Sequence, residues 1–571
     1  MRLNIVKSKN ATSYYVQKTV YKDGRQTSVI VEKLGTYAAI KERLNGADPL
    51  TWAKQRVEEL SKKEQEEKAI DLHLVLSSGK IIDKNEQRLF NGGYLFLKQI
   101  YKRLELTKLC KHIAKKYKFK YDLDSILSRL LYSRIIYPDS KLATFELSKQ
   151  FIEKPNFDLH HIYRALDVLE TESDLIQATV YENSLKIVKR KTGVLYYDLT
   201  NYFFELEQAS GYKQYGYSKE HRPNPIVQMG LFMDGSGIPL AFNINPGNTS
   251  EQTTMKPLEQ KILKDFNLSK FIVCTDAGLA SEENRKFNSC ADRAFITIQS
   301  IKKLKGYLRK WCLEPNNWRL SGSTHDFDLT KIDEEEHKNS IFFKERWIKE
   351  NGFEQRLIVT FSLKYRNYLQ TLRSQQIDRA SNLIKKGATK LKKNGANDCK
   401  RFIKRTDCTA NGEIAETTVY TIDKSIIENE QAYDGFYAVC TNIEDQVAEI
   451  IAINKKRWEI EECFRIMKSE FKARPVYLSK DNRIKAHFLT CFLALLVYRL
   501  LEAKLNNNFT CGEIVQGLKD MNFTEIKRKG YIPSYERTKL TDAFHEEFGF
   551  RTDYDILTYD QINKIIKMTN K

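Results

Sequence analysis

Residues 194–205 read VLYYDLTNYFFE, a run of β-branched and aromatic residues with one aspartate, Asp198, near its middle. Such a composition predicts a strand that is buried on both faces. Moving a carboxylate out of water costs roughly several kcal/mol unless a partner compensates its charge. We therefore expect Asp198 to face a cation.

A second aspartate ends a later strand. After the loop GYSKEHRPNP come the strand patterns VQMGLFMD and IPLAFNINPGN, the helical pattern TTMKPLEQKILKDF, and the strand pattern KFIVCTD, which ends at Asp276. Three strands in hairpin order, a helix and a further strand open an RNase H-like fold, in which the first strand lies centrally, beside the strand after the helix. We therefore predict that Asp198 and Asp276 meet at one edge of the sheet. The plainer alternative for Asp276 is a strand-ending turn, which is also what Asp234 resembles.

A helical pattern supplies a third acid. Residues 455–471 read KKRWEIEECFRIMKSEF and repeat with helical periodicity. At about 100° per residue, Arg457 and Lys468 fall within about 40° of Glu461, whereas Glu462 lies about 100° away. The neighbouring apolar face consists of Ile460, Phe464, Met467 and Phe471. Glu461 therefore borders the core with two cations on its stripe; the alternative is a solvated face held by Arg–Glu pairs four residues apart.

The charge balance favours a polyanionic partner. The 571 residues include 94 Lys and Arg against 74 Asp and Glu, a formal net charge of +20. This excess fits nucleic acid first and an acidic membrane surface second. The longest apolar stretch, residues 488–498, is too short to span a bilayer and no signal-peptide pattern opens the chain, so we expect a soluble protein. Ten cysteines without a CxxC pair or a Cys/His cluster predict reduced thiols in cytoplasm, with neither a zinc site nor a disulfide framework.

The first third of the chain has two parts that differ in predicted secondary structure. SYYVQKTVY and QTSVIVEKL flank a turn at Asp23-Gly24, a hairpin signal that predicts a small β unit over residues 1–36. Residues 37–190 are largely helical in pattern and rich in Lys and Arg. Short helices joined by turns fit a helix-turn-helix type DNA-binding region. They fit a plain helical bundle about as readily, and the sequence leaves both alternatives open.

The motifs together match a known pattern. Residues 457–461 read RWEIE, and Lys468 follows Glu461 at the spacing glutamate-x6-lysine. GYSKEHRP, PGNTSE, CTDAGLAS, and RPVYL followed by RIKAHFLTCFLALL extend the match over most of residues 190–500. The chain resembles the DDE transposases of bacterial insertion sequences, in the group with a tyrosine-x2-arginine-x3-glutamate-x6-lysine signature. Asn454 occupies the tyrosine position, which puts the contact made by that phenol in question.

The resemblance implies an α/β fold: an RNase H-like catalytic core, a largely β insertion domain and an N-terminal mostly helical DNA-binding region. The chain between the second aspartate and the glutamate is much longer than the bare fold requires, which places the insertion there. The implied domains are a small N-terminal β unit (1–36), a helical, DNA-binding region (37–190), the first part of the core (191–300), the insertion domain (301–440), the second part of the core with the catalytic helix (441–504), and a C-terminal region without an indicated role (505–571).

The resemblance also implies a chemistry. Such enzymes hydrolyse a phosphodiester at the transposon end and then use the freed 3′-hydroxyl to attack target DNA, with two metal ions at the reacting oxygens. Mg2+ prefers carboxylate oxygens, phosphate and water, and Mn2+ is expected to substitute for it. By resemblance, Asp198, Asp276 and Glu461 are the catalytic residues and metal ligands. The cation expected beside Asp198 is then a divalent metal.

Several cations are candidate DNA contacts. Arg457 and Lys468 are implied to bind phosphates of the scissile strand. His221 and Arg222 are further candidates, with a plain surface loop as the equal alternative. Residues 373–405 form a basic run whose density favours phosphate contacts over a solvated helical surface. Its candidate residues are Lys385, Lys386, Lys390, Lys392 and Lys393.

Three tryptophans of the implied insertion domain, Trp311, Trp318 and Trp347, have two interpretations. An aromatic residue there could stack on a flipped base. Core packing is the simpler explanation, because large aromatic side chains dominate cores.

The sequence as a whole predicts a bacterial, nucleoid-associated cytoplasmic transposase that acts on double-stranded DNA, both transposon ends and target. It is expected to work as a homodimer or larger assembly on paired ends, without a membrane partner. One alternative is a domesticated, non-catalytic DNA-binding protein, against which the three intact acids argue. Another is a metal-dependent nuclease without strand transfer, with which the sequence is compatible.

Overall fold

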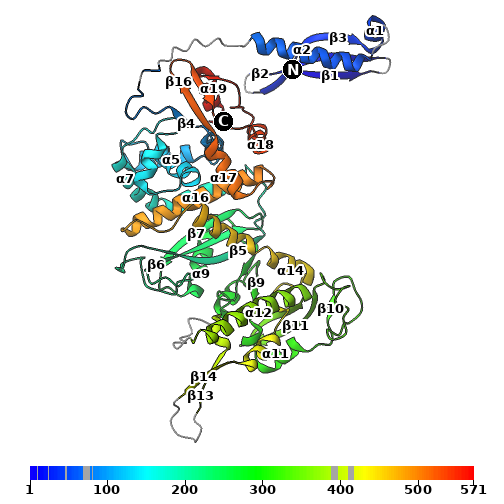
Figure 1. Ribbon diagram of the computed structural model, residues 1–571, viewed down its shortest axis with the longest axis vertical. Helices are drawn as coiled ribbons and strands as arrows, with labels where there is room; N and C mark the ends of the chain where they lie inside the picture. The colour runs from blue at the N-terminus through cyan, green and yellow to red at the C-terminus, as the bar shows by residue number, and fades with distance from the viewer. Residues whose placement is uncertain are drawn as a thin grey trace. The chain divides into compact units, whose positions relative to one another are not determined.

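The computed structural model describes residues 1–8, 11–22, 25–44, 48–67, 78–79, 81–387, 397–408 and 417–570. The chain separates into two compact units, Met1–Glu86 and Gln87–Lys571 (Figure 1). Each unit is described by itself below.

The first unit is a three-stranded antiparallel sheet with two helices. Its elements are β1 (Arg2–Lys7), β2 (Thr12–Lys22), β3 (Arg25–Thr36), α1 (Tyr37–Arg43) and α2 (Pro49–Glu67). A small core joins sheet and helices through Tyr14, Val16, Leu34, Ile40 and Ala53. β2 and β3 pair with each other as far as Lys22 and Arg25, as the hairpin signal predicted. The predicted turn, Asp23-Gly24, lies outside the described residues.

A helical layer opens the second unit. Its elements are β4 (Leu89–Asn91), α3 (Tyr94–Arg103), α4 (Leu106–Tyr117), α5 (Leu123–Ile136), α6 (Lys141–Ser148), α7 (Leu159–Thr171) and α8 (Ser173–Ser184). α5 is buried along most of its length, as expected for a helix with apolar residues on every side. The layer rests on helix α16 (Asp481–Lys504), which packs against α3, α5 and α7 and against a strand of the central sheet, β7 (Pro239–Pro246) (Figure 1).

Helix α16 contains the apolar stretch at residues 488–498. It is long and apolar enough to cross a membrane, with a mean hydropathy of 1.6, yet 89% of that window is buried inside the protein. A helix that is apolar all round and covered on all sides is typical of the centre of a large core. α16 therefore forms the apolar core between the helical layer and the sheet.

The central sheet carries the first two acids. Its described strands lie in the order β10 (Arg319–Leu320), β11 (Phe342–Glu350), β12 (Phe353–Phe361), β15 (Phe436–Thr441), β9 (Arg293–Ile298), β8 (Phe271–Thr275), β5 (Val194–Phe203), β6 (Ile226–Asp234) and β7. The first part of the sheet and its helices are β5 (Val194–Phe203), β6 (Ile226–Asp234), β7, α9 (Met255–Asp265), β8 (Phe271–Thr275), α10 (Glu282–Phe287) and β9 (Arg293–Ile298). β5 pairs antiparallel with β6 and parallel with β8. The first strand thus lies inside the sheet beside the strand that follows α9, as the sequence predicted.

The alternation of side chains along β5 decides which face Asp198 occupies. Leu195 and Tyr197 pack in the cluster formed with α9, whereas Tyr196 and Tyr202 pack in the large cluster that includes α16. Successive side chains of a strand point to opposite faces. Asp198 shares the phase of Tyr196 and Tyr202, so it lies on the face away from α9.

The segment between β9 and the third acid extends the same sheet. It comprises α11 (Gly306–Leu313), β10 (Arg319–Leu320), β11 (Phe342–Glu350), β12 (Phe353–Phe361), α12 (Leu363–Lys385), β13 (Ile403–Cys408), β14 (Thr417–Ile422), α13 (Lys424–Gln431) and β15 (Phe436–Thr441). β15 pairs with both β12 and β9, and the longest element is the 23-residue helix α12. The segment is therefore mixed α/β and shares its sheet with the core, where the sequence predicted a largely β insertion domain; the backbone of β9 offered an edge that these strands complete.

The chain then returns to the sheet and ends in the helical layer. The returning elements are α14 (Val447–Lys455), α15 (Trp458–Arg465) and a π-helical turn, Ile466–Glu470, followed by α16. The last elements are α17 (Cys511–Asp520), β16 (Asn522–Ile526), β17 (Gly530–Pro533), α18 (Lys539–Phe548), β18 (Leu557–Thr558) and α19 (Tyr559–Met568). β16 pairs with β4, and Phe96 of α3 stacks on Phe544 and Phe550. Residues 505–571 are thus packed into the helical layer, a structural role that their sequence did not indicate.

Candidate active site

Asp198 and Asp276 lie at the same level on neighbouring chain segments. In the parallel pairing of β5 with β8, Tyr196 lies opposite Cys274. Asp198 and Asp276 each follow two residues later, just beyond the last paired residues, and the charge of Asp276 acts on Asp198, so the two side chains lie near each other. Asp276 comes directly after β8 and directly before a turn. The pairing places the two aspartates at the same end of neighbouring strands, as predicted, and their role as metal ligands stays a prediction.

Asp198 is a buried carboxylate with little local compensation. Its relative exposure is 8%, and its Oδ1 accepts a hydrogen bond from the Leu199 amide at 2.7 Å. Burial raises the pKa of Asp198 to about 6; the nearby Lys219 opposes this shift and Asp276 adds to it. An acid that is desolvated and placed beside a second acid is typical of a site that binds a cation.

Asp276 is held by the turn that follows it. Its Oδ1 accepts hydrogen bonds from the amides of Gly278 at 3.0 Å and Leu279 at 3.1 Å. The plainer interpretation of Asp276 as a turn residue is therefore correct as well. Asp276 can be a turn residue and a metal ligand at the same time, because its carboxylate has a second oxygen.

The third acid stands on helix α15, which packs against β5. Arg457 precedes the helix, and its Nη2 lies 3.0 Å from Oε1 of Glu461, whose side chain is 56% exposed. Arg457 also interacts electrostatically with both Asp198 and Asp276. Arg457 therefore pairs directly with Glu461 and acts on the two aspartates through its charge. Glu461 is largely exposed, whereas the sequence predicted that it borders the core. The Arg–Glu pair four residues apart, which was the alternative for this face, is present in the same arrangement.

The position of Lys468 in the site does not follow from α-helical periodicity. The chain leaves the α-helix at Arg465 and continues as a π-helical turn that includes Lys468, so the 100° spacing does not apply there. Lys468 Nζ donates to Thr200 Oγ1 on β5 at 2.6 Å and lies 3.7 Å from Glu220. Burial lowers the pKa of Lys468 to about 8. Lys468 is therefore anchored to the strand that carries Asp198, and π-helical turns are frequent at functional sites.

The Glu462 side chain forms an ion pair with Arg465. Arg465 donates to its two carboxylate oxygens, at 2.8 Å from Nε and 2.7 Å from Nη2. The Glu462 side chain is 28% exposed against 56% for Glu461, so the prediction that Glu462 points further out than Glu461 is wrong, and the bidentate pair with Arg465 partly covers Glu462. The geometry fits a pair that stabilises the helix.

A cleft of about 1010 Å³ opens beside Glu461. Its lining includes Arg457, Trp458 and Tyr437. Tyr437 stands on β15, and its hydroxyl accepts a hydrogen bond from Asn454 Nδ2 at 3.0 Å. Asn454 occupies the tyrosine position of the signature, so the structure places a phenol from another strand next to that position. No local sequence pattern could have predicted that Tyr437 lies beside Asn454, since the two residues come from different elements.

The loop after β5 contributes a different cation from those predicted. His221 is exposed with a φ of 55°, and the Arg222 guanidinium stacks on Phe203 at 4.1 Å and lies 3.6 Å from Glu220. Lys219 lies closer to the acids: its Nζ donates to the Leu199 carbonyl oxygen at 2.5 Å and its charge acts on Asp198. The motif GYSKEHRP contained Lys219, but only the fold shows that it faces Asp198.

Glu251 is a fourth acid near the site that sequence reasoning passed over. A Cβ built on Gly278 would lie 3.3 Å from Glu251 Oε2 and 3.4 Å from Asp276 Oδ1. Glu251 also lies 3.9 Å from Lys219. The motif PGNTSE that contains Glu251 was the available signal.

The remaining candidate DNA contacts are partly outside the described residues. Lys385 and Lys386 end helix α12 and are exposed, whereas Lys390, Lys392 and Lys393 fall in residues 388–396, which the structure does not describe. Of the tryptophans, Trp318 is fully buried in the core of this region. Trp311 packs against that core beneath Lys344 and Arg346, and Trp347 is exposed. Core packing therefore explains Trp311 and Trp318.

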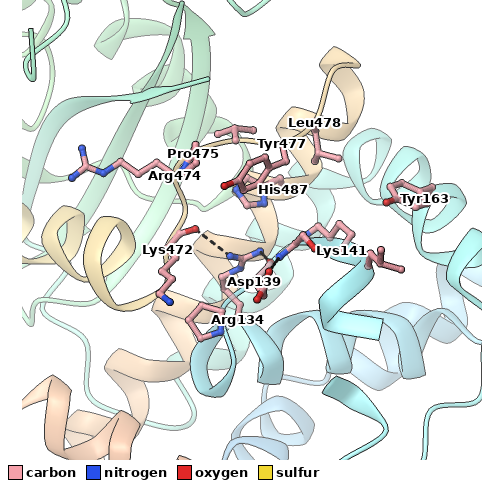
Figure 2. A pocket seen from close by; sticks show the side chains of 14 residues that line it. Arg134, Asp139, Lys141, Tyr163, Lys472, Arg474, Pro475, Tyr477, Leu478 and His487 are labelled. Carbon is pink, nitrogen blue, oxygen red and sulfur yellow. Dashed lines mark hydrogen bonds between the residues drawn. The ribbon is translucent and has the colours of Figure 1, made fainter. Parts of the chain in front are cut away.

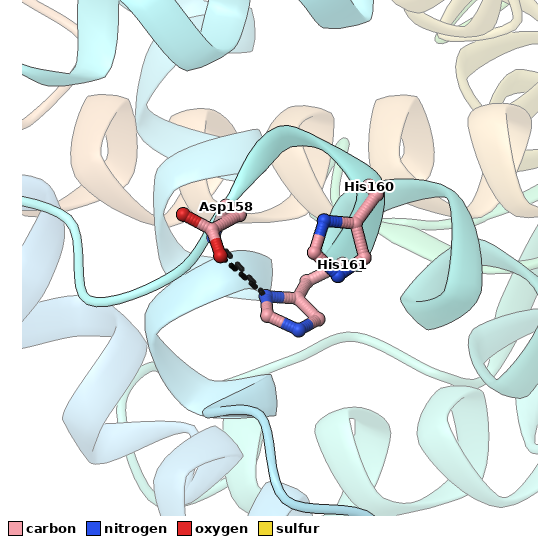
Figure 3. Close-up of side chains that lie close together, drawn as sticks. All are labelled: Asp158, His160 and His161. Carbon is pink, nitrogen blue, oxygen red and sulfur yellow. Dashed lines mark hydrogen bonds and ion pairs between the residues drawn. The ribbon is translucent and has the colours of Figure 1, made fainter.

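Two other groups of potential ligands are explained by local structure. In the described ranges, Asp158 with His160 and His161, and Asp542 with His545 and Asp553, have ligand atoms within 4.8 Å of one another. In the first group, His161 Nδ1 accepts from the Asp158 amide at the start of α7 (Figure 3). In the second, Arg551 pairs with both acids. Capping and ion pairing account for both groups.

Comparison with known proteins identifies the family. No match was found among curated proteins. A piggyBac transposase synaptic complex with hairpin DNA is similar at a TM-score of 0.34 and 7% sequence identity, covering 83% of this chain and 84% of that chain, a likeness too low to indicate a shared fold. The model of the transposase DDE domain family matches residues 190–497, a range that includes Asp198, Asp276 and Glu461. Because this match spans more than half of the chain and all three acids, the protein belongs to the family of transposases with a DDE domain.

Proposed function

We propose that this protein is the DNA transposase of an insertion sequence, which cleaves DNA at the transposon ends and joins those ends to target DNA. The observation that carries the proposal is the parallel pairing that brings Asp198 near Asp276, with the charge of Arg457 acting on both and its guanidinium paired with Glu461. The strand order around β5 supports the assignment of the core to the RNase H-like class. A net charge of +20 supports double-stranded DNA as the partner.

The acids are suited to hold divalent metal. Asp198 is buried, has one short hydrogen bond from a backbone amide and no ion pair within 4 Å among the described residues. A carboxylate in that situation fits Mg2+ better than it fits solvent. Asp198, Asp276 and Glu461 would hold the metal. When bound, two such ions supply activation of the attacking oxygen and stabilisation of the leaving oxygen.

The surrounding cations have separate tasks. Arg457 holds Glu461 and presents a planar guanidinium that binds phosphate bidentately. Lys468, fixed to Thr200, provides a second phosphate contact beside Asp198. Lys219 offsets the charge of the buried Asp198. Together they orient the scissile phosphate toward the acids.

Tyr437 takes the place of the signature tyrosine in this proposal. Burial raises the pKa of Tyr437 to about 12, so its hydroxyl keeps its proton at neutral pH. Since Asn454 donates to the Tyr437 oxygen, the hydroxyl proton is available for a phosphate oxygen in the cleft. Tyr437 and Arg457 would thereby bind the same strand from two elements.

Transposition requires two ends to be held together, so we infer a homodimer or larger assembly on DNA in the bacterial cytoplasm, associated with the nucleoid. End recognition is assigned to residues 1–190. The basic end of α12, with Lys385 and Lys386, is assigned to sequence-independent phosphate contacts.

The test uses the full chain with a duplex that carries the inverted repeats flanking the gene. In Mg2+, the wild type should free a 3′-hydroxyl at the repeat and join that end to a target plasmid. Asp198→Asn should abolish both steps while DNA affinity changes less than about twofold, because cations hold the phosphates. Asp326→Asn, at an exposed aspartate, is the matched control and should remain active.

Each alternative has its own outcome in that test. Cleavage without joining would identify a metal-dependent nuclease. Binding without cleavage by the wild type would identify a non-catalytic DNA-binding protein. Full cleavage by Asp198→Asn would overturn the assignment of the metal ligands.

A further inference from the structure

A second cationic site lies between the helical layer and the segment that follows the catalytic helix. It is a pocket of about 250 Å³. Figure 2 shows Arg134 and Lys141 at its centre, with His487 near them and Lys472 at its side. The pocket therefore collects basic groups from α5, α6, α16 and the segment after the π-helical turn.

Lys141 is the unusual residue of this pocket. It is the first residue of helix α6 and its relative exposure is 6%. Its Nζ is buried without a hydrogen-bond partner. Burying an amine in this way costs free energy unless an anion or water satisfies it. Burial and the neighbouring Arg134 lower the pKa of Lys141 to about 7.

The charge of Arg134 is equally uncompensated. Its relative exposure is 4%, and its guanidinium donates to the carbonyl oxygens of Phe471 at 3.0 Å and Asp139 at 3.1 Å. Carbonyl oxygens orient a guanidinium without neutralising it. Its Nε has no partner. In the described part of the chain, no acidic side chain forms an ion pair with Arg134 or Lys141.

The other polar groups of the pocket do not supply the missing anion. His487 Nε2 donates to the Ala473 carbonyl oxygen at 3.2 Å, so it is a donor there. The carboxylate of Asp139 accepts from the Ser140 amide at 2.6 Å at the start of α6, and Asp139 is exposed. Ser140, Lys141 and Leu142 line the pocket, so the N-terminus of α6, with its partial positive charge, opens into it.

We infer that this pocket binds a phosphate group of the DNA backbone, with Lys141 and Arg134 as its charged ligands and the start of α6 as a further donor. A volume of about 250 Å³ accommodates a phosphate with bridging water. The inference rests on the proposed function for the identity of the anion, and it adds a contact outside the cleft beside Glu461.

The location indicates what the contact does. Arg134 binds the carbonyl oxygens of Phe471 and Lys472, a few residues after Lys468. Arg474, also in the lining, forms an ion pair with Glu220, which in turn lies 3.7 Å from Lys468. A phosphate held in the pocket would thus fix the chain immediately after the catalytic helix. The site positions DNA and does not touch the reacting atoms.

The experiment compares Lys141→Met, which keeps the length of the side chain and removes its charge, with Lys149→Met. Lys149 caps the other end of α6, has a side chain that is 44% exposed and pairs with Glu146, so it controls for the loss of one charge. Phosphate ethylation interference on the end-containing duplex is the first readout. For wild type and Lys149→Met, ethylation of one particular phosphate should block DNA binding. Ethylation of the same phosphate should have no effect on DNA binding by Lys141→Met.

Two further readouts use the same variants. The slope of log affinity against log salt concentration should fall by about one for Lys141→Met and stay unchanged for Lys149→Met. In the absence of DNA, inorganic phosphate should raise the Tm of wild type over chloride at equal ionic strength, and Lys141→Met should lose that rise. Lys472→Gln, at an exposed residue of the lining, provides a second variant should Lys141→Met fail to fold, and should weaken the same interference signal.

The outcomes separate this inference from the proposed function. Interference and salt slope identical to wild type in both Lys141→Met and Lys472→Gln would overturn it. A lost phosphate effect on Tm with unchanged interference would mean that the pocket takes a free anion only, which also overturns the DNA contact. A wild type that binds DNA without cleaving it, yet shows the Lys141-dependent phosphate, would refute the proposed function and leave this site standing.

Discussion

Asn454 Nδ2 donates a hydrogen bond to the Tyr437 hydroxyl at 3.0 Å, across the gap between α14 and β15. The family signature has a tyrosine where this chain has Asn454. The asparagine thus holds in place a phenol that a neighbouring strand contributes. Both residues line the cleft that contains Arg457 and Glu461.

Removing only that hydroxyl tests its role. Tyr437→Phe should leave the Tm within a few degrees of wild type and lower single-turnover cleavage by roughly 10-fold or more, as expected for loss of one hydrogen bond to a charged group. The measurement is single-turnover cleavage of the end-containing duplex in Mg2+. Tyr368→Phe, at an exposed tyrosine lining the same cleft, is the control and should cleave nearly as fast as wild type. Equal rates for both variants would return Tyr437 to a packing role.

The neighbouring acids Glu461 and Glu462 should differ sharply. Glu461→Gln keeps the size of the side chain but removes the charge that metal requires, so cleavage should fall by several orders of magnitude. Glu462→Gln should cost little activity, because both carboxylate oxygens of Glu462 are bound by Arg465. Single-turnover cleavage of both variants decides the matter. An inactive Glu462→Gln beside an active Glu461→Gln would show that the wrong acid has been assigned.

Lys141 should make stability depend on pH in a defined direction. Burial lowers the pKa of Lys141 from 10.5 to about 7. Between pH 10.5 and 7 the unfolded chain takes up a proton that the folded chain does not, so the free energy of unfolding falls as the pH falls through this window. Below about pH 7 the loss is complete.

The variant Lys141→Met lacks this penalty. Without DNA or phosphate, it should be more stable than wild type at pH 7, and the difference in Tm should shrink as the pH is raised toward 10. Thermal denaturation in a non-phosphate buffer across that range is the measurement, with Lys149→Met as the reference variant. A Tm difference that stays constant with pH would mean that Lys141 is paired in solution.

The basic end of α12 should contribute affinity without sequence preference. Lys385→Gln combined with Lys386→Gln should weaken binding to repeat-containing and unrelated duplexes by the same factor and flatten the salt dependence by about one to two units of slope. Titrations at several salt concentrations provide the measurement. An unchanged slope would support a solvated helical surface. A loss confined to the repeat-containing duplex would place sequence recognition in this segment.

Local sequence determined those features that depend on spacing along one element. The apolar run around Asp198 specified a buried strand because a run of β-branched and aromatic residues has few other ways to bury its side chains. The order of strands and helix after it was enough to predict that Asp198 and Asp276 are neighbours, since parallel strands joined through a helix tend to lie side by side. The four-residue spacing of Arg457 and Glu461 was enough to predict their pairing.

Features that depend on packing between distant segments were decided by the tertiary structure. The π-helical turn that contains Lys468 packs against α16 and α17 and bonds to β5 through Lys468, and no periodic pattern encodes it. Lys219 and Tyr437 reach the acids from a loop and a distant strand, so nothing in the spacing of charges along the chain marks them. Lys141 lies in an ordinary helical start, and only the approach of the segment after the catalytic helix buries it. Side-chain periodicity is a property of one element, whereas burial and electrostatic environment are set by the elements that pack around it.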